Sequence, residues 1–138
     1  MIAYLDASVV LRLVLGERGR LAEWKRVETA VASALTEVEC LRTLDRLTRS
    51  GSLSDEELAE RRTAVYRLLE AVEVVDVSRP ILRRASEPFP ASLGTLDAIH
   101  LSTAISWRDV RGADLTMATH DKALATAARS VGLQVIGA

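Results

Sequence analysis

Short apolar runs alternate along this chain with longer segments in which apolar residues recur every three to four positions. The apolar runs predict strands over residues 1–5, 30–33, 73–77, 115–118 and 134–136. The helical period predicts helices over residues 7–15, 20–28, 36–50, 55–72, 80–86, 96–107 and 122–130. Strands and helices that alternate in this way are typical of an α/β protein with a mainly parallel sheet covered on both faces.

Two local patterns refine this prediction. Ser54 and Glu57 form a capping box, because the hydroxyl and the carboxylate can satisfy each other's backbone N–H groups at a helix start. The helices predicted over 36–50 and 55–72 would then form a hairpin that protrudes and suits an interface. We see no linker, repeat or low-complexity segment, so residues 1–138 are expected to form a single domain.

Acidic residues follow the predicted strands or begin the predicted helices. Asp6 directly follows the first strand, and Asp121 follows the strand 115–118 by way of Thr119 and His120. Asp97 lies just inside a helix, and a further acid comes from the start of the helix 36–50. In an α/β fold such positions meet beside the carboxyl ends of the strands. Carboxylates crowded together repel each other unless a cation neutralises them, and such hard oxygen ligands select Mg²⁺ or Mn²⁺. The pattern therefore indicates a metal-dependent enzyme that cuts phosphodiesters.

Each acid also has a purely structural interpretation. Asp6 and Asp121 could simply cap the helices that follow them, and Asp97 is favoured by the dipole of its own helix. Apolar residues around Glu37 and Glu39 are spread over the helix, so the helical phase does not choose between these two acids. Together, however, acids at successive strand ends and helix starts favour one shared site.

Composition excludes several other classes of protein. There are 18 basic and 19 acidic residues, with no block of like charge that would suggest a nucleic-acid-binding tail. Sixteen of the basic residues are Arg, whose planar group suits phosphate, although genomic base composition or surface ion pairs explain such abundance better. No apolar stretch approaches the roughly 20 residues that span a bilayer, and the start lacks a signal-peptide pattern, so we expect a cytoplasmic protein.

Cysteine and histidine add little chemistry of their own. Cys40 is the only cysteine, which excludes an internal disulfide and favours a small buried side chain. His100 lies on an apolar helix and is expected in the core or behind the site rather than as a ligand. His120 could contact RNA or a metal-bound water. Neither histidine comes with the motif of a Ser/His or Cys/His hydrolase.

Four motifs resemble a known family. The chain is similar to PIN-domain ribonucleases of the VapC toxin type over essentially its whole length. The segments that carry the resemblance are Tyr4-Leu5-Asp6-Ala7-Ser8-Val9-Val10, Ser33-Ala34-Leu35-Thr36 with Val38-Glu39 and Arg42, Leu96-Asp97-Ala98-Ile99-His100-Leu101-Ser102-Thr103-Ala104, and Thr119-His120-Asp121-Lys122-Ala123-Leu124 with Ala127-Ala128-Arg129, Gly132-Leu133 and Val135-Ile136. The third segment is the most specific match. His120 stands where the family more often has an aromatic residue.

The resemblance implies a three-layer α/β/α sandwich and selects Glu39 over Glu37. It implies that Asp6, Glu39, Asp97 and Asp121 surround one or two Mg²⁺ or Mn²⁺ ions. Ser8 and Thr119 would order the groups around them. It further implies cleavage of single-stranded RNA, a homodimer, and an antitoxin protein whose segment blocks the site.

Two other functions compete with this one. The first is an aspartyl-phosphate phosphatase or receiver-like domain, in which Asp6 or another strand-end Asp accepts the phosphoryl group. A phosphatase would be expected to carry a second Asp where this chain has Ser8. The second is a non-catalytic, PIN-like interaction protein. The presence of all four acids counts against it, because an inert binder does not need to crowd carboxylates.

Overall fold

Five parallel strands form the centre of the protein. The structure is a computed structural model that describes residues 1–16, 19 and 21–138. The strands β1 (Ile2–Leu5), β2 (Thr29–Ser33), β3 (Glu73–Val75), β4 (Thr116–Ala118) and β5 (Gln134–Ile136) lie in the order β3-β2-β1-β4-β5. Each neighbouring pair is parallel, so all carboxyl ends point to the same edge of the sheet. The central position of β1 places Asp6 in the middle of that edge.

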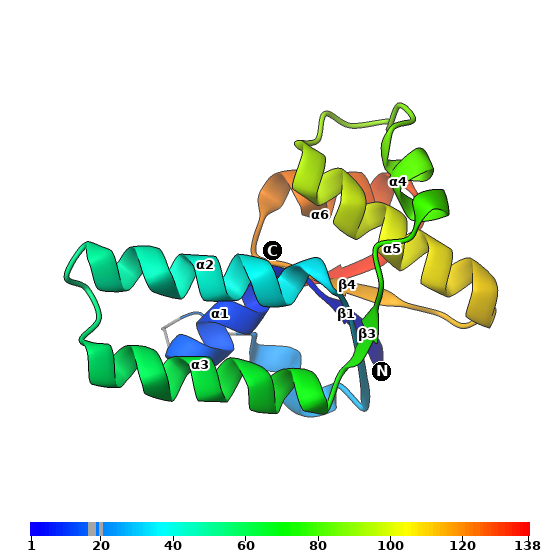
Figure 1. Cartoon of the computed structure of the whole chain (residues 1–138). Coiled ribbons are helices and arrows are strands. Elements are labelled where there is room, and N and C mark those ends of the chain that lie inside the picture. Colours follow the sequence, from blue (N-terminus) through cyan, green and yellow to red (C-terminus); the bar gives the residue numbers. More distant parts are fainter. Residues whose placement is uncertain (17–18, 20) are drawn as a thin grey trace.

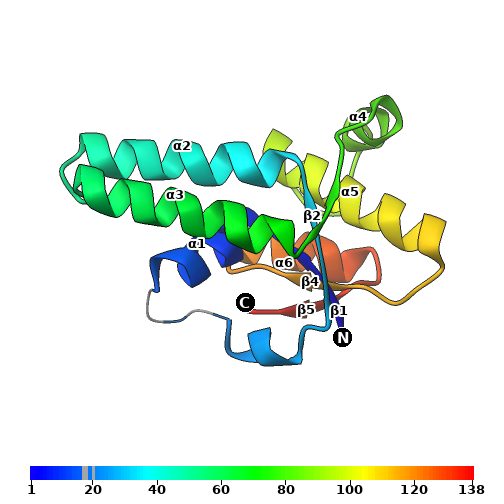
Figure 2. The same ribbon diagram turned by 60° about the horizontal axis from the view of Figure 1, so that its bottom comes forward.

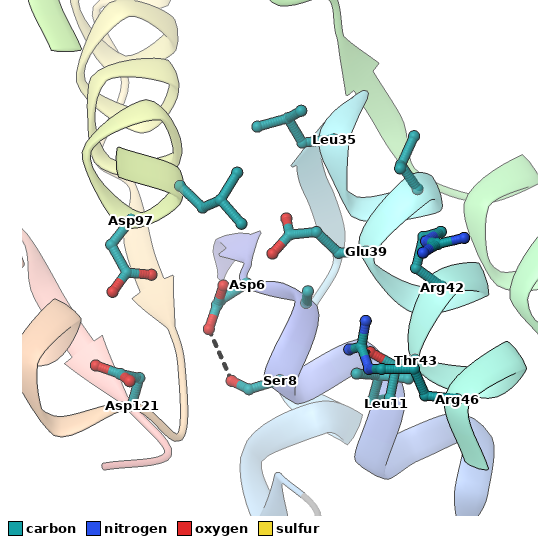
Figure 3. Close-up of a pocket in the computed structure, with 13 residues that line it drawn as sticks. Asp6, Ser8, Leu11, Leu35, Glu39, Arg42, Thr43, Arg46, Asp97 and Asp121 are labelled. Atoms are coloured by element: carbon teal, nitrogen blue, oxygen red, sulfur yellow. Dashed lines mark hydrogen bonds between the residues drawn. The ribbon is translucent and has the colours of Figure 1, made fainter. Parts of the chain in front are cut away.

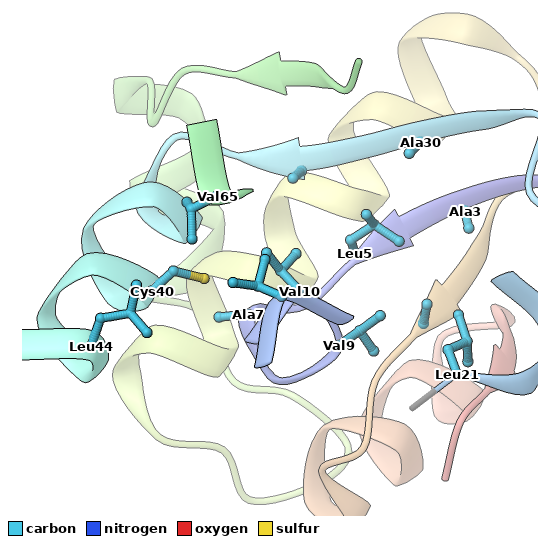
Figure 4. Close-up of a cluster of buried hydrophobic side chains, with 13 residues drawn as sticks. Ala3, Leu5, Ala7, Val9, Val10, Leu21, Ala30, Cys40, Leu44 and Val65 are labelled. Carbon is cyan, nitrogen blue, oxygen red and sulfur yellow. The ribbon is translucent and has the colours of Figure 1, made fainter. Parts of the chain in front are cut away.

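Helices cover both faces of the sheet, which gives the three-layer α/β/α sandwich (Figure 1). Ala3 and Leu5 pack on one face against α1 (Ala7–Leu15), α2 (Leu35–Arg49) and α3 (Asp55–Glu70), as Figure 4 shows for the buried side chains. Tyr4 points to the other face, where α5 (Thr95–Arg111) and α6 (Lys122–Ser130) supply the core. Helix α4 (Arg79–Ala85) packs beside α5. This alternation follows from the two-residue period of a strand.

The hairpin predicted from the sequence is formed by α2 and α3. The two helices run side by side and extend well beyond the sheet in both views (Figures 1 and 2). Cys40 and Leu44 of α2 and Val65 of α3 are fully buried in the core shared with α1. The capping box is present, because Ser54 Oγ accepts a hydrogen bond from the Glu57 N–H and Glu57 Oε1 accepts one from the Ser54 N–H, both at 3.1 Å.

Some predicted boundaries were wrong. The helix predicted over 20–28 is only a short 3₁₀ helix, Ala22–Arg26, and residue 20 lies outside the described residues. Helix α5 continues past Trp107 to Arg111, where Gly112 ends it with a left-handed backbone at φ 60°. Strand β3 stops at Val75 instead of reaching Val77. In the described part of the chain, no helix is both long and apolar enough to cross a membrane.

Candidate functional site

A cleft of about 480 Å³ opens at the edge of the sheet where the strands end (Figure 3). All four predicted carboxylates line it: Asp6 after β1, Glu39 on α2, Asp97 on α5 and Asp121 after β4. Ser8 also lines the cleft, and Thr119 lies buried directly behind Asp6. The parallel topology has therefore gathered acids that lie up to 115 residues apart, from Asp6 to Asp121.

Asp6 occupies the first position before α1, but its side chain makes no capping hydrogen bond. Instead, its Oδ2 atom accepts hydrogen bonds from Ser8 Oγ at 2.8 Å and from Thr119 Oγ1 at 2.9 Å. Its backbone N–H donates to the carbonyl of Ala118 at 3.0 Å, which ties β1 to the end of β4. The interpretation of Asp6 as a simple helix cap is wrong, and its carboxylate is held in a fixed orientation at the cleft.

Thr119 connects two of the acids. The side chain is fully buried, and its Oγ1 atom donates to Asp6 while it accepts a hydrogen bond from the Asp121 N–H at 3.0 Å. Asp121 does cap α6, because its Oδ1 atom accepts from the Leu124 N–H at 2.8 Å. Capping uses one oxygen of Asp121, and this exposed carboxylate still lines the cleft. Capping therefore does not remove Asp121 from the cleft, and its role toward a metal ion stays a prediction.

Glu39 and Glu37 lie on opposite sides of α2. Glu39 is half-buried and lines the cleft, whereas Glu37 is exposed to solvent away from it. Oε1 of Glu39 lies 2.5 Å from Nε2 of His100, which reaches across from α5. The geometry thus agrees with the register that selects Glu39.

His100 forms a buried connection between Glu39 and Tyr4. Its Nδ1 atom lies 2.8 Å from the Tyr4 hydroxyl, and its Nε2 atom is also 3.9 Å from Oδ1 of Asp6. Burial alone would lower the pKa of His100. The hydrogen bond to Glu39 and the charges of Glu39, Asp6 and Asp97 outweigh it and raise that pKa above its ordinary 6.5. His100 therefore stands behind the acids, as its apolar helix predicted.

The carboxylates repel one another across the cleft. The pKa of Asp97 is raised above its ordinary 3.8, first by burial and then by the negative charges of Asp121 and Asp6, with a smaller contribution from Glu39. A cation in the cleft would relieve this repulsion. Among the described residues, no three His, Cys, Asp or Glu side chains stand close enough together to hold a metal ion by themselves. Mg²⁺ usually keeps several waters and takes few protein ligands, so the donors fit a hydrated divalent ion.

His120 and Cys40 lie among groups that hold the fold together and do not contribute side chains to the cleft. Nδ1 of the His120 ring lies 2.8 Å from the carbonyl oxygen of Gly137. The backbone N–H of His120 donates to Ser8 Oγ at 3.1 Å, and His120 does not line the cleft. Cys40 is fully buried, and burial, with the charges of Glu39 and Asp6, raises the pKa of its thiol to about 12. A thiol with so high a pKa does not supply a nucleophile at neutral pH.

Sequence reasoning missed three residues of the site. Tyr4 and Arg42 belong to motifs of the sequence without a predicted role, yet Tyr4 contacts His100 and Arg42 lines the cleft. Arg46 lines it as well. The signal was available for the arginines, because residues three and seven positions after Glu39 share its helix face.

Comparison with known proteins agrees with this geometry. The family model described as PIN domain matches residues 3–130. The chain is 34% identical to "Ribonuclease VapC46" of Mycobacterium tuberculosis over 96% of this chain and 95% of that protein, and 28% identical to "Ribonuclease VapC47" of the same organism over 94% and 91%. A toxin–antitoxin complex from Klebsiella pneumoniae contains a chain with the same fold, with a TM-score of 0.68 at 17% identity over 97% of this chain and 95% of that one. The chain belongs to the PIN-domain family and, within it, to the VapC-type ribonucleases.

Proposed function

We propose that this protein is a divalent-metal-dependent endoribonuclease that cleaves single-stranded RNA and acts as the toxin of a toxin–antitoxin pair. One observation carries the proposal: four carboxylates from four separate segments line one cleft at the carboxyl ends of the strands. PIN-domain nucleases generally use divalent metal ions. Burial and then the charges of Asp121 and Asp6 raise the pKa of Asp97, and the repulsion between these carboxylates favours a cation in the cleft. Mg²⁺ or Mn²⁺ suits donors that are all oxygen atoms.

Each acid has a role that follows from its surroundings. Asp6, Asp97 and Asp121 would surround the ion and hold it in part through its coordinated waters, and Glu39 would complete the acidic ring directly or through water. When bound, the ion lowers the pKa of a coordinated water and polarises the scissile phosphate. Ser8 and Thr119 both donate to one oxygen of Asp6, which fixes the plane of that carboxylate and leaves its other oxygen for the cleft.

An antitoxin protein and a second copy of the chain are the protein partners that we propose from the similarity to VapC-type ribonucleases. A solved relative in fold is described as a toxin–antitoxin complex, which supports a cognate antitoxin whose segment enters the cleft and blocks it. We also expect a homodimer and a cytoplasmic location, where the RNA substrate is present. We expect residues 1–138 to form a single catalytic domain.

The test is cleavage of single-stranded and structured RNAs by the purified protein with Mg²⁺, with Mn²⁺ and with EDTA. We expect cleavage with a metal ion, none with EDTA, and none by the Asp6→Asn variant, which should remain folded. The Asp45→Asn variant is the matched control, because Asp45 forms a surface ion pair with Arg49 outside the cleft. An Asp6→Asn protein with full activity would exclude the mechanism.

The same preparations separate the two competing functions. An aspartyl-phosphate enzyme would become labelled when incubated with a small phosphoryl donor, and labelling would disappear in the Asp6→Asn variant. A non-catalytic interaction protein would cleave nothing under any metal condition. We expect no label and metal-dependent cleavage.

A further inference from the structure

The cleft continues beyond the acids along one face of α2. Glu39, Arg42, Thr43 and Arg46 are spaced at i, i+3, i+4 and i+7, so they lie on the same side of the helix. All four line the cleft. Figure 3 shows Asp97 and Asp121 on one side of it, and Arg42, Thr43 and Arg46 on the other. We call Arg42, Thr43 and Arg46 the arginine face of α2.

Among the residues that the structure describes, neither Arg42 nor Arg46 forms an ion pair. Glu39 has the right spacing to pair with Arg42, but its carboxylate is directed to His100 at 2.5 Å. Asp45, next to Arg46, pairs with Arg49 at 3.0 Å. Within the described residues, no carboxylate oxygen lies within 4.0 Å of the side-chain nitrogens of Arg42 or Arg46. No carboxylate in the described part of the chain therefore neutralises either cation, which leaves both able to bind an anionic ligand.

One contact orients the arginine face. Nη2 of Arg46 donates a hydrogen bond to Thr43 Oγ1 at 2.9 Å, which holds this guanidinium against the helix beside the cleft. Both arginines are exposed. Like charges four residues apart on a helix repel each other, and an anion that binds between or beside them would relieve that repulsion.

The charges of the cleft are divided between its two ends. The acids gather at the strand ends, and the arginines continue from Glu39 toward the free end of the α2–α3 hairpin. A ligand that fits both ends must carry one phosphate that a metal ion can bind at the acidic end, and further negative charges that the arginines can bind at the other end. Arg42 and Arg46 are separated by about 6 Å along the helix axis, at 1.5 Å per residue. This separation is on the scale of neighbouring phosphates in an extended RNA strand, and the guanidinium group binds phosphate in a bidentate manner.

We propose that the arginine face of α2 binds two phosphates of the RNA on one side of the scissile bond. The strand then runs from the acids along α2 toward the tip of the hairpin. This inference rests on the proposed nuclease function and adds the direction in which the substrate lies. Thr43 acts as a positioning residue, because it touches the guanidinium of Arg46 and holds it in place.

The test measures RNA binding without cleavage, in the Asp6→Asn background. A fluorescein-labelled single-stranded RNA of mixed sequence is titrated with each protein at several NaCl concentrations in the presence of Mn²⁺. Each arginine that neutralises a phosphate contributes about 0.7 to the slope of log K against log [salt] for a single strand. We expect Arg42→Gln and Arg46→Gln each to lower the slope by about 0.7, and the double variant to lower it by about 1.4.

Arg49→Gln is the matched control, since Arg49 lies on the same helix, pairs with Asp45 and does not line the cleft. Its slope should equal that of the parent. A second readout uses RNAs in which one phosphate at a time is replaced by a neutral methylphosphonate. Methylphosphonate at either of two adjacent positions should weaken binding by the parent. At the position that Arg42 contacts it should not weaken binding by Arg42→Gln any further, and the same should hold for Arg46 and Arg46→Gln at the other position.

The outcomes separate this inference from the nuclease proposal. Unchanged slopes in the Arg42→Gln and Arg46→Gln variants would overturn the arginine-face inference, while binding and cleavage of RNA by the parent would leave the nuclease proposal intact. An Asp6→Asn protein that binds no RNA would overturn the arginine-face inference, whereas a parent that cleaves no RNA with either metal ion would overturn the nuclease proposal. Loss of poly-L-glutamate binding in the arginine variants with an unchanged RNA slope would assign the face to an acidic protein segment, and would also overturn the inference.

Discussion

Nε2 of His100 lies 2.5 Å from Oε1 of Glu39, so a buried histidine on α5 holds an acid on α2 at the cleft. An ionised carboxylate can only accept a hydrogen bond, and Nε2 must therefore carry a hydrogen. The Tyr4 hydroxyl at the other ring nitrogen can donate or accept, which suits both the neutral and the charged ring. This contact turns Glu39 toward the strand ends and away from Arg42.

His100 should therefore affect catalysis through the position of Glu39. His100→Leu removes the donor, and we expect Mn²⁺ affinity or turnover to fall about 10- to 100-fold, the usual cost of losing a group behind a metal ligand. His100→Gln keeps an N–H group near the position of Nε2 and should recover part of the loss. Titration calorimetry with Mn²⁺, together with kcat and KM for RNA cleavage, measures both effects. Equal Mn²⁺ affinity together with equal turnover in the parent and both variants would contradict this role.

The two neighbouring glutamates on α2 give a prediction about register. Residues two apart on a helix are about 200° apart around its axis, and only Glu39 lines the cleft. Glu39→Gln should reduce cleavage severely with little change in stability. Glu37 is a first-turn acid that the helix dipole favours by about 0.3–1 kcal/mol, so Glu37→Gln should cost a little stability and leave turnover intact. Cleavage assays and urea unfolding of both variants decide the matter, and the opposite pattern would show that the register is wrong.

The raised pKa of Asp97 gives a pH dependence in metal-free protein. Because the folded pKa lies above the ordinary 3.8, Asp97 stabilises the fold when protonated, and this contribution is lost as pH rises through the folded pKa. With EDTA at neutral pH, Asp97→Asn should melt at a higher temperature than the parent, since it removes one charge from the repulsion. The difference should shrink as pH falls toward 3.8 and Asp97 takes up its proton. Thermal melts across this pH range, with Asp45→Asn as the surface control, test it. An Asp97→Asn protein that melts no higher than the parent at neutral pH would contradict the prediction.

Much of this architecture could be predicted because the order of the strands and helices along the chain follows from the local pattern of apolar and polar residues. The apolar period located all five strands, and a parallel sheet necessarily brings Asp6 and Asp121 to the same edge. The resemblance to a known family supplied the choice of Glu39, which periodicity alone left open. The roles proposed for these acids remain predictions that the experiments above address.

Other features depend on contacts between distant segments and left no local signal. His100 and Glu39 are 61 residues apart, and nothing in either helix predicts their hydrogen bond. The 3₁₀ helix Ala22–Arg26 carries the same short-range pattern as an α-helix, so its length was overestimated. The need for glycine at residue 137 also left no local signal, because it comes from a close contact between the residue after β5 and the loop after β4.

Gly137 packs against the loop that holds Asp6. Its backbone has φ +93°, and an added Cβ would lie 2.7 Å from the carbonyl oxygen of Thr119. The Thr119 N–H donates to the carbonyl of Ile136 at 3.1 Å, so the strand end and the loop are tied together. The Thr119 hydroxyl in turn donates to Asp6. A side chain at residue 137 would thus displace a loop that orients one of the four carboxylates.

Gly137→Ala should therefore weaken the fold and the metal site together. Backbone strain at positive φ costs about 1–3 kcal/mol, and the contact with Thr119 adds to it. Gly51→Ala is the matched control, because Gly51 has φ +81° but no atom within 4 Å of its added Cβ, so it carries the strain without the contact. Urea unfolding should show a larger loss of stability for Gly137→Ala, and Mn²⁺ affinity should fall in that variant alone. Equal stability losses with unchanged Mn²⁺ affinity would show that the loop yields without moving Asp6.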